Sequence, residues 1–256
     1  MLSRILVVTA LYATPVAAEP LFPNSVVSNS IDFIRGDDPS AFHCLAYTGV
    51  IRAEMPDKRS DVLFVDDVFA YLARFRDGTD VPIWIHPDIG SEAAARDIAR
   101  PAVEALGKLP TAMRGRLNHV VIHSGNETAF AEDEGRFFVL YSENIKTRLR
   151  DNDLEETVFH ESVHATLDVP FLRDAAWLAA QAADGAFITE YAARHPAKED
   201  FAESALFAWA LLQHPGRLPL SFETRVRTIM PNRLAFFETL LNDGPVFTRT
   251  DLRPDC

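Results

Sequence analysis

The spacing of apolar residues changes about halfway along the chain, and this change limits the folds that the chain can adopt. In the first half, short apolar runs rich in β-branched and aromatic residues predict strands at 81–86, 119–123 and 136–141. From Asp153 onwards the apolar residues recur every three to four positions, which is typical of helices. Strands followed by helices predict an α+β fold, in which a small mixed sheet precedes a mainly helical lobe.

Other segments of the first half fit this scheme. A further strand is expected within 44–51. The apolar spacing predicts a buried helix over 61–75. A second, alanine-rich helix is predicted over 91–106, with Ser91 as its N-cap.

The second half contains one helix of particular interest, which begins after Asp153. Asp153 and Glu156 have the spacing of a capping box. We expect this helix to end near Leu167, because Pro170 disfavours helical geometry at the residue that precedes it. Further helices are expected over 172–184, 186–194, 197–213, 221–229 and 232–241.

The first 18 residues have the features of a secretory signal peptide. Arg4 supplies the positive charge, and residues 5–13 form the apolar run. Small residues at 16–18 then suit cleavage before Glu19. The run is shorter than the roughly 20 apolar residues of a transmembrane helix. We therefore expect export to the periplasm or the medium and no membrane span in the mature chain; the alternative is an ordinary N-terminal core helix.

Export bears on the two cysteines, Cys44 and Cys256. In an oxidising compartment two cysteines are more often bridged than free, so a disulfide between them is expected. The alternative is two unrelated thiols. A metal site built on them is not expected, because neither has a partner at CxxC spacing.

The composition excludes some partners but names no activity. Acidic residues outnumber basic ones by 37 to 25, which gives a formal charge of −12. Nucleic-acid binding needs a basic face, so no nucleic-acid partner is expected, and a polybasic membrane-surface protein is equally disfavoured. Apolar residues make up 48% of the 256, enough for a sizeable core. We expect a single domain over 19–256, with a sheet-bearing lobe at about 61–168 and a helical lobe at about 169–256.

Residues 160–164, His-Glu-Ser-Val-His, form an HExxH motif within the predicted helix. Four residues advance a helix by just over one turn, so His160 and His164 share one face about 6 Å apart. Two imidazoles at this spacing can bind one tetrahedral zinc ion. Glu161 would lie beside them as a general base for a zinc-activated water molecule. The alternative is a surface helix with two solvated histidines.

A second pair of side chains four residues apart lies in the predicted helix over 197–213. Glu199 and Glu203 share one helix face. One carboxylate can bind a metal ion while the other accepts the free N–H of a ligand histidine. The alternative is two acids on a solvated face. Apolar neighbours such as Phe201 and Trp209 favour burial of this helix, and buried carboxylates need partners.

The sequence HESVHATLD, followed by Tyr191 and then EDFAE, resembles the gluzincin metallopeptidases over about residues 154–210. The resemblance is closest to the catalytic domain of the anthrax lethal-factor type. It implies a zincin-like fold with one Zn²⁺ ion held by His160, His164 and Glu199. It also implies that Glu203 contacts the first histidine and that Tyr191 faces the zinc.

The resemblance further implies a function, an exported zinc peptidase. Glu161 would take a proton from the activated water and pass it to the leaving amine, while Tyr191 stabilises the developing oxyanion. Apart from the resemblance, Asp168 lies one turn beyond His164 and is expected to orient the active-site helix or a neighbouring side chain; the alternative is a solvated acid at the helix end. A peptide substrate would pair antiparallel with the strand at 136–141. Two alternatives remain: a non-catalytic zinc-binding or interaction protein on the same scaffold, and an accidental motif.

Overall fold

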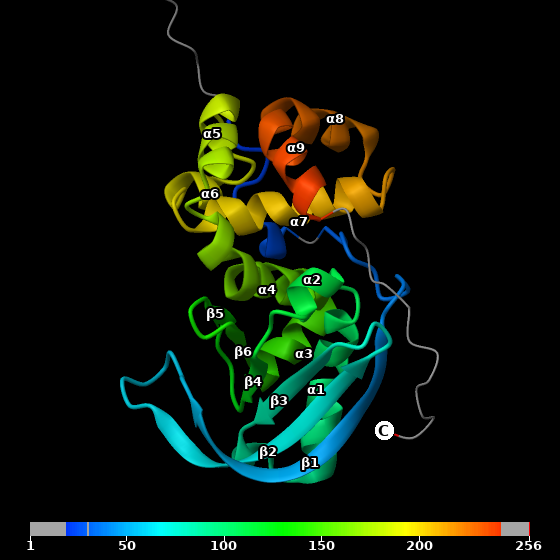
Figure 1. Cartoon of the computed structure of the whole chain (residues 1–256), viewed down its shortest axis with the longest axis vertical. Coiled ribbons are helices and arrows are strands. Elements are labelled where there is room, and N and C mark those ends of the chain that lie inside the picture. Colours follow the sequence, from blue (N-terminus) through cyan, green and yellow to red (C-terminus); the bar gives the residue numbers. More distant parts are fainter. Residues whose placement is uncertain (1–18, 30, 242–255) are drawn as a thin grey trace, which may run out of the picture.

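The computed structural model describes residues 19–29, 31–241 and 256, so the expected signal peptide at 1–18 lies outside the described residues. The described part confirms the α+β prediction. Figure 1 shows the sheet at one end of the molecule, five helices (α5–α9) at the other, and α4 between them. The strands are β1 (Phe42–Met55), β2 (Phe64–Phe75), β3 (Asp80–Ile85), β4 (His119–His123), β5 (Phe130–Glu132) and β6 (Phe137–Tyr141).

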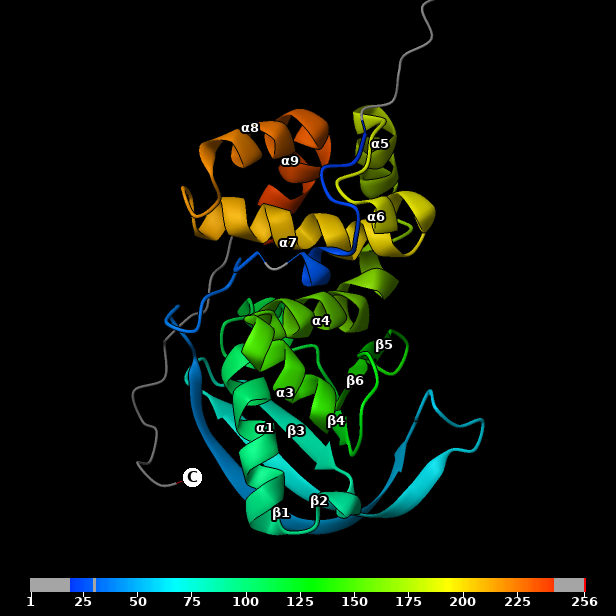
Figure 2. The ribbon, with the colours of Figure 1, turned by 180° about the vertical axis from the view of Figure 1, so that it is seen from behind.

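The helices cover one face of the sheet and build the other half of the molecule (Figure 2). A short 3₁₀ turn, η1 (Val26–Ser28), precedes the sheet, and η2 (Pro87–Ile89) follows β3. The α-helices are α1 (Glu92–Leu106), α2 (Thr111–Arg114), α3 (Ser142–Asp151), α4 (Leu154–Phe171), α5 (Ala175–Asp184), α6 (Glu190–Arg194), α7 (Glu199–Gln213), α8 (Leu220–Ile229) and α9 (Pro231–Leu240). Within the described ranges, no helix is long and apolar enough to cross a membrane.

The strand order is β1-β2-β3-β4-β6-β5. β3, β4 and β6 run parallel, whereas β5 pairs antiparallel with the first three residues of β6. The strand expected at 136–141 is β6, so that strand is confirmed, but β6 lies between β4 and β5. The prediction that a peptide would pair with this strand is therefore wrong over Phe137–Val139, because β5 already occupies that side and forms the edge of the sheet.

The helix predicted over 61–75 is wrong, because this segment forms β2. Its apolar residues fit helical spacing, but β2 pairs with β1 from one end to the other, from Met55↔Phe64 to Phe42↔Phe75. This long-range pairing decides the conformation, since strand preference depends on neighbours in the sheet. It also places β1 in the sheet, which therefore begins at Phe42, before the expected lobe boundary of about 61.

Most other local predictions are confirmed. Strands form where 81–86 and 119–123 predicted them, and the helix over 91–106 is α1. Ser91 caps α1, because its hydroxyl accepts a hydrogen bond from the backbone N–H of Ala94 at 3.2 Å.

Helix α4 departs from the prediction at both ends. No capping box forms: the Asp153 carboxylate accepts a hydrogen bond from Arg148 at 2.9 Å, and Glu156 turns inward to accept from the backbone N–H of Ile34 at 2.9 Å. Tertiary partners thus replace the local cap. The helix also continues through Pro170, which lies in its last turn, and ends at Phe171.

A buried ion-pair network fixes the start of α7. The Arg233 guanidinium on α9, fully buried, contacts Asp184 at 3.0 Å and Asp200 at 2.5 Å. Asp184 ends α5, and Asp200 directly follows the first residue of α7. The network therefore ties three helices together beside Glu199. Breaking such a pair by removing one partner typically costs about 3–5 kcal/mol.

The expected disulfide is present. Cys44 on β1 is bonded to the C-terminal Cys256, with the two Cα atoms 5.7 Å apart. The bond closes a loop with a sequence separation of 212 residues. Closing a long loop restricts the unfolded chain, so the disulfide favours the folded state.

Removing the disulfide should lower the free energy of unfolding by about 2–4 kcal/mol. The measurement is urea unfolding of the oxidised wild type and of the Cys44→Ser/Cys256→Ser double variant. Reduced wild-type protein serves as the control, and its midpoint should move to that of the double variant. Equal midpoints for the oxidised wild type and the double variant would contradict the prediction.

A candidate metal centre in a cleft

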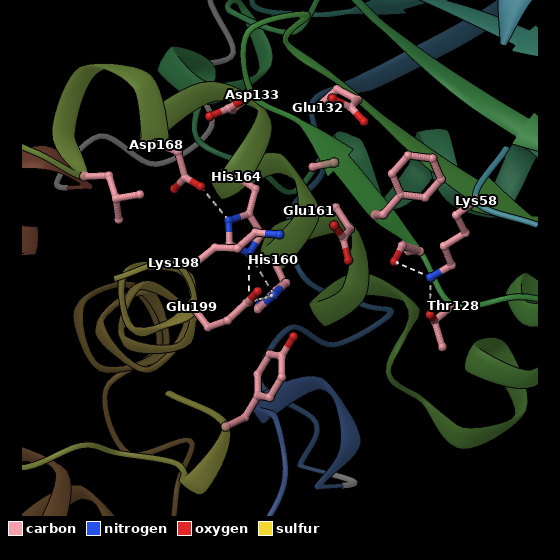
Figure 3. A pocket seen from close by; sticks show the side chains of 15 residues that line it. Lys58, Thr128, Glu132, Asp133, His160, Glu161, His164, Asp168, Lys198 and Glu199 are labelled. Atoms are coloured by element: carbon pink, nitrogen blue, oxygen red, sulfur yellow. Dashed lines mark hydrogen bonds and ion pairs between the residues drawn. The ribbon is translucent and has the colours of Figure 1, made fainter. Parts of the chain in front are cut away.

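Two helices bring three metal-binding side chains together. α4 presents His160 and His164 on one face, and the first residue of α7, Glu199, lies opposite them (Figure 3). One ligand atom from each residue lies within 4.8 Å of the others, and all three side chains are buried. These residues form a group that can hold a metal ion.

The separations suit one small ion. His164 Nε2 lies 3.2 Å from His160 Nε2 and 3.1 Å from Glu199 Oε2, and the His160 Nε2–Glu199 Oε2 separation is 3.5 Å. Nitrogen and oxygen ligands at about 2.0–2.1 Å from a tetrahedral zinc ion would stand roughly 3.3–3.5 Å apart. The three atoms therefore fit a zinc-like ion without large rearrangement.

Carboxylates lie behind both histidines. His164 Nδ1 is 2.7 Å from Asp168 Oδ2, one helical turn further along α4. His160 Nδ1 is 3.6 Å from Glu203 Oε1, and it has no hydrogen-bond partner although it is buried. A carboxylate at Nδ1 favours a proton on that nitrogen, which leaves the Nε2 lone pair facing the centre. This is the arrangement that metal-ligating histidines require.

The three ligands interact strongly with one another. Burial disfavours the charged form of His164, but hydrogen bonds with Asp168 and Glu199 outweigh it and raise the pKa of His164 to about 10. Burial would raise the pKa of Glu199, but hydrogen bonds from His160 and His164 hold this pKa well below its usual range. In the metal-free protein the negative charges around His164 therefore keep its imidazole in the charged form at neutral pH, with a proton on both ring nitrogens.

Glu161 and Tyr191 line the same cleft as the three ligands. Glu161 is buried, and burial raises the pKa of its carboxyl group. In Figure 3 it lies between the histidine pair and Lys58. Tyr191 comes from α6; burial and the neighbouring Glu199 carboxylate raise the pKa of its phenol to about 12. Both groups therefore border the space in front of the metal ligands.

The cleft has a volume of about 560 Å³. Its floor is α4, one wall is β5 with the residues that flank it, and the other wall is formed by α6 and the start of α7. Besides the residues singled out in the sequence, the cleft is lined by Lys58, Thr128, Ala129, Phe130, Ala131, Glu132, Asp133, Leu172 and Lys198. This volume lies within the roughly 300–1,000 Å³ range of ligand-binding clefts.

Lys58 could not be predicted from the sequence, because it reaches the cleft from the hairpin between β1 and β2. Its ammonium group donates a hydrogen bond to the Thr128 hydroxyl. The neighbouring Asp57 accepts a hydrogen bond from the Tyr141 hydroxyl at 2.9 Å, and Arg59 donates to the Ser124 carbonyl at 2.9 Å. These contacts dock the hairpin loop on the ends of β4 and β6, far from Lys58 in sequence.

The residues singled out in the sequence lie around one centre. Asp168 and Glu203 flank the two histidines, and Glu161 and Tyr191 share the cleft with them, whereas the disulfide is a separate feature on β1. No family model, curated protein or solved structure matches this chain.

Zinc binding should weaken as the pH falls. The pKa of His164 is raised to about 10, so His164 carries a proton at pH 7 that metal binding must displace. The apparent affinity for Zn²⁺ should then fall by about tenfold for each pH unit between roughly pH 9 and pH 6. Competition with a chelator of known affinity at each pH measures this dependence.

Calorimetry in two buffers of different ionisation enthalpy supplies an independent count of the displaced protons. About one proton should leave per zinc ion bound. The Asp168→Asn variant removes one of the carboxylates that raise the pKa of His164, so its affinity should depend less on pH. An affinity that does not change over this range would show that His164 carries no proton to displace.

Proposed function

We propose that this chain is an exported zinc peptidase that cleaves peptide bonds with Glu161 as the general base. The observation that carries the proposal is that Glu161 lines the same cleft as the buried His160, His164 and Glu199 group. A zinc ion bound there would supply Lewis-acid chemistry, polarising a substrate carbonyl and acidifying water. The HExxH spacing and the separations of the ligand atoms support zinc as the metal.

Glu161 is suited to moving a proton within the cleft. Its raised pKa brings the carboxyl group nearer to neutral pH, where a general base is most effective. It can accept a proton from water as water attacks the carbonyl carbon, and then donate that proton to the leaving amine. A metal site without catalysis has no need of such a carboxylate, so its presence favours an enzyme over a binding protein.

Tyr191 is suited to donating a hydrogen bond to the substrate. With a pKa of about 12, its phenol keeps its proton at neutral pH. We propose that this hydroxyl donates to the oxyanion that develops on the attacked carbonyl. Preorganised donors of this kind contribute roughly 2–4 kcal/mol to transition-state stabilisation.

The edge strand β5 is suited to binding an extended peptide. Phe130–Glu132 end the sheet, and Phe130 and Glu132 also line the cleft. An edge strand offers backbone N–H and C=O groups to an added strand. We therefore place the substrate along β5, in place of the strand at 136–141. The substrate class is a peptide or a protein segment in extended conformation.

The Cys44–Cys256 disulfide supports an exported protein. Disulfides persist in the periplasm and outside the cell but are rare in the reducing cytosol. Together with the signal-peptide features of residues 1–18, this favours a periplasmic or secreted location.

Two matched variants test the proposal directly. Glu161→Gln should keep its zinc but lose cleavage of a peptide library by about 10²–10⁴-fold, because only the proton acceptor is removed. Glu199→Gln should weaken zinc binding by more than the roughly 10–100-fold typical of residues that support ligands. Bound zinc is measured by elemental analysis, and cleavage by mass spectrometry of the library. Glu238→Gln, an exposed substitution on α9, is the control.

The outcomes separate the candidate functions. Wild-type protein that binds zinc and cleaves no peptide would favour a non-catalytic zinc-binding protein. Wild-type protein that binds no zinc would overturn both the metal centre and the peptidase proposal. Equal cleavage by Glu161→Gln and wild type would remove Glu161 from the mechanism.

Tyr191→Phe tests the oxyanion donor. Loss of the hydroxyl should lower kcat by about 10²–10³-fold while KM and zinc affinity change little, since the hydrogen bond forms only in the transition state. Steady-state kinetics on a peptide found in the library gives both constants. A rise in KM with unchanged kcat would instead assign Tyr191 to substrate binding.

A further inference from the structure

The N-terminal end of the described chain passes between the two helices that carry the metal ligands. We call residues 21–28 the N-terminal strap. Figures 1 and 2 show its last part, η1, between α4 and α7, and the residues before η1 beside α6 and α7. The Leu21 N–H donates to the Ile188 carbonyl at 2.9 Å, and the Phe22 ring stacks on Phe207 of α7 with centroids 5.4 Å apart. The strap is therefore packed into the core beside the metal centre.

The strap binds Glu203, the carboxylate behind His160. The Ser25 hydroxyl donates to Glu203 Oε1 at 2.5 Å, and the Val26 N–H donates to Oε2 at 2.7 Å. A third donor, the Thr189 hydroxyl, contacts Oε2 at 2.8 Å. Glu203 is fully buried, so these three donors fix the position of its carboxylate.

The position of Glu203 bears directly on His160. Glu203 Oε1, the atom that accepts from Ser25, is the atom 3.6 Å from His160 Nδ1. His160 Nδ1 has no other partner in the described structure, so its proton has one carboxylate to face. At 3.6 Å the two atoms are slightly further apart than a hydrogen bond allows, so they form a close ion-pair contact. The position of the Glu203 carboxylate therefore affects the orientation of the His160 ring, and with it the direction in which Nε2 faces the metal centre.

The two ligand histidines differ in this respect. His164 is oriented by Asp168, four residues further along the same helix. His160 faces Glu203 of α7, and Glu203 is itself held by the strap, 177 residues away in sequence at Val26. The helix alone can set the orientation of His164, whereas that of His160 depends on tertiary structure.

We propose that the N-terminal strap is a structural part of the metal centre, in which Ser25 and Val26 position Glu203 and Glu203 orients His160. This inference rests on the proposed metal site. Docking of the strap and binding of the metal are then coupled, and the coupling is reciprocal. An undocked strap weakens metal binding, and a bound metal ion stabilises the docked strap.

Thr189 extends the same network towards Tyr191. Its hydroxyl donates to Glu203 and also accepts from the Ala192 N–H at 3.0 Å, which caps α6. Substitution of Thr189 would disturb α6 as well as Glu203. The Ser25 side chain contacts Glu203 and caps no helix, so a substitution at Ser25 tests the contact with Glu203 more directly than one at Thr189.

The test compares three substitutions within the strap of the full mature chain. Ser25→Ala should weaken Zn²⁺ binding by about 10–100-fold and change the visible spectrum of the Co²⁺-substituted protein, because His160 loses its fixed partner. Ser25→Thr keeps the hydroxyl and should stay within about threefold of wild type. Ser28→Ala, at an exposed strap residue, is the matched control. Melting temperatures in the presence of a chelator show whether each variant is folded.

A second measurement needs no variant. Hydrogen exchange of residues 21–28 in wild-type protein should slow when Zn²⁺ is added, since the metal stabilises the docked strap. The inference is overturned if Ser25→Ala binds zinc as Ser28→Ala does, or if exchange in the strap is unchanged by zinc. Wild-type protein that binds no zinc would instead overturn the proposed metal centre itself, so the two failures are distinguishable.

Discussion

Helix α4 is enclosed by the sheet on one side and by α7 on the other, and the rest of the structure is arranged around it. Every residue from Leu154 to Asp168 except Glu155 is buried. An unpaired polar group in such a position costs roughly 1–3 kcal/mol, so each ionisable side chain on α4 needs a partner from the surrounding elements. The positions of those partners determine where on α4 a metal site can form.

Most of these partners come from distant parts of the chain, whereas Asp168 lies on α4 itself. Glu156 binds the backbone of Ile34, His164 binds Asp168 and Glu199, and His160 faces Glu203. The buried Arg233 network in turn holds the start of α7 in place. Packing of α4 against α7 is thus both a core contact and the step that assembles the ligand set, which couples the stability of the fold to the geometry of the site.

The sheet contributes access to this centre. β5 ends the sheet beside α4, and the hairpin between β1 and β2 carries Lys58 to the rim of the cleft. The hairpin loop is held by Asp57 and Arg59 on the ends of β4 and β6. Residues of β5, the three ligands and Glu161 line the same cleft, so an edge strand lies beside the metal centre for the peptide substrate that we propose.

Local sequence patterns predicted an element correctly where its tertiary contacts favour the same conformation. Ser91 caps α1 as predicted, and the i, i+4 spacing of His160 with His164 and of Glu199 with Glu203 placed each pair on one helix face. The same kind of pattern was wrong over 61–75, where pairing with β1 overrides helical spacing, and at Asp153, where Arg148 replaces the capping box.

The sequence by itself determined the α+β class, the HExxH helix and the carboxylates that can serve it, because these follow from spacings of a few residues. Only the tertiary structure decided that β5 forms the edge of the sheet, that Lys58 reaches the cleft, and that Ser25 and Val26 hold Glu203. These contacts join residues tens to hundreds of positions apart, and no local periodicity encodes them. They form only when the folded chain encloses α4 and brings these distant residues together around it.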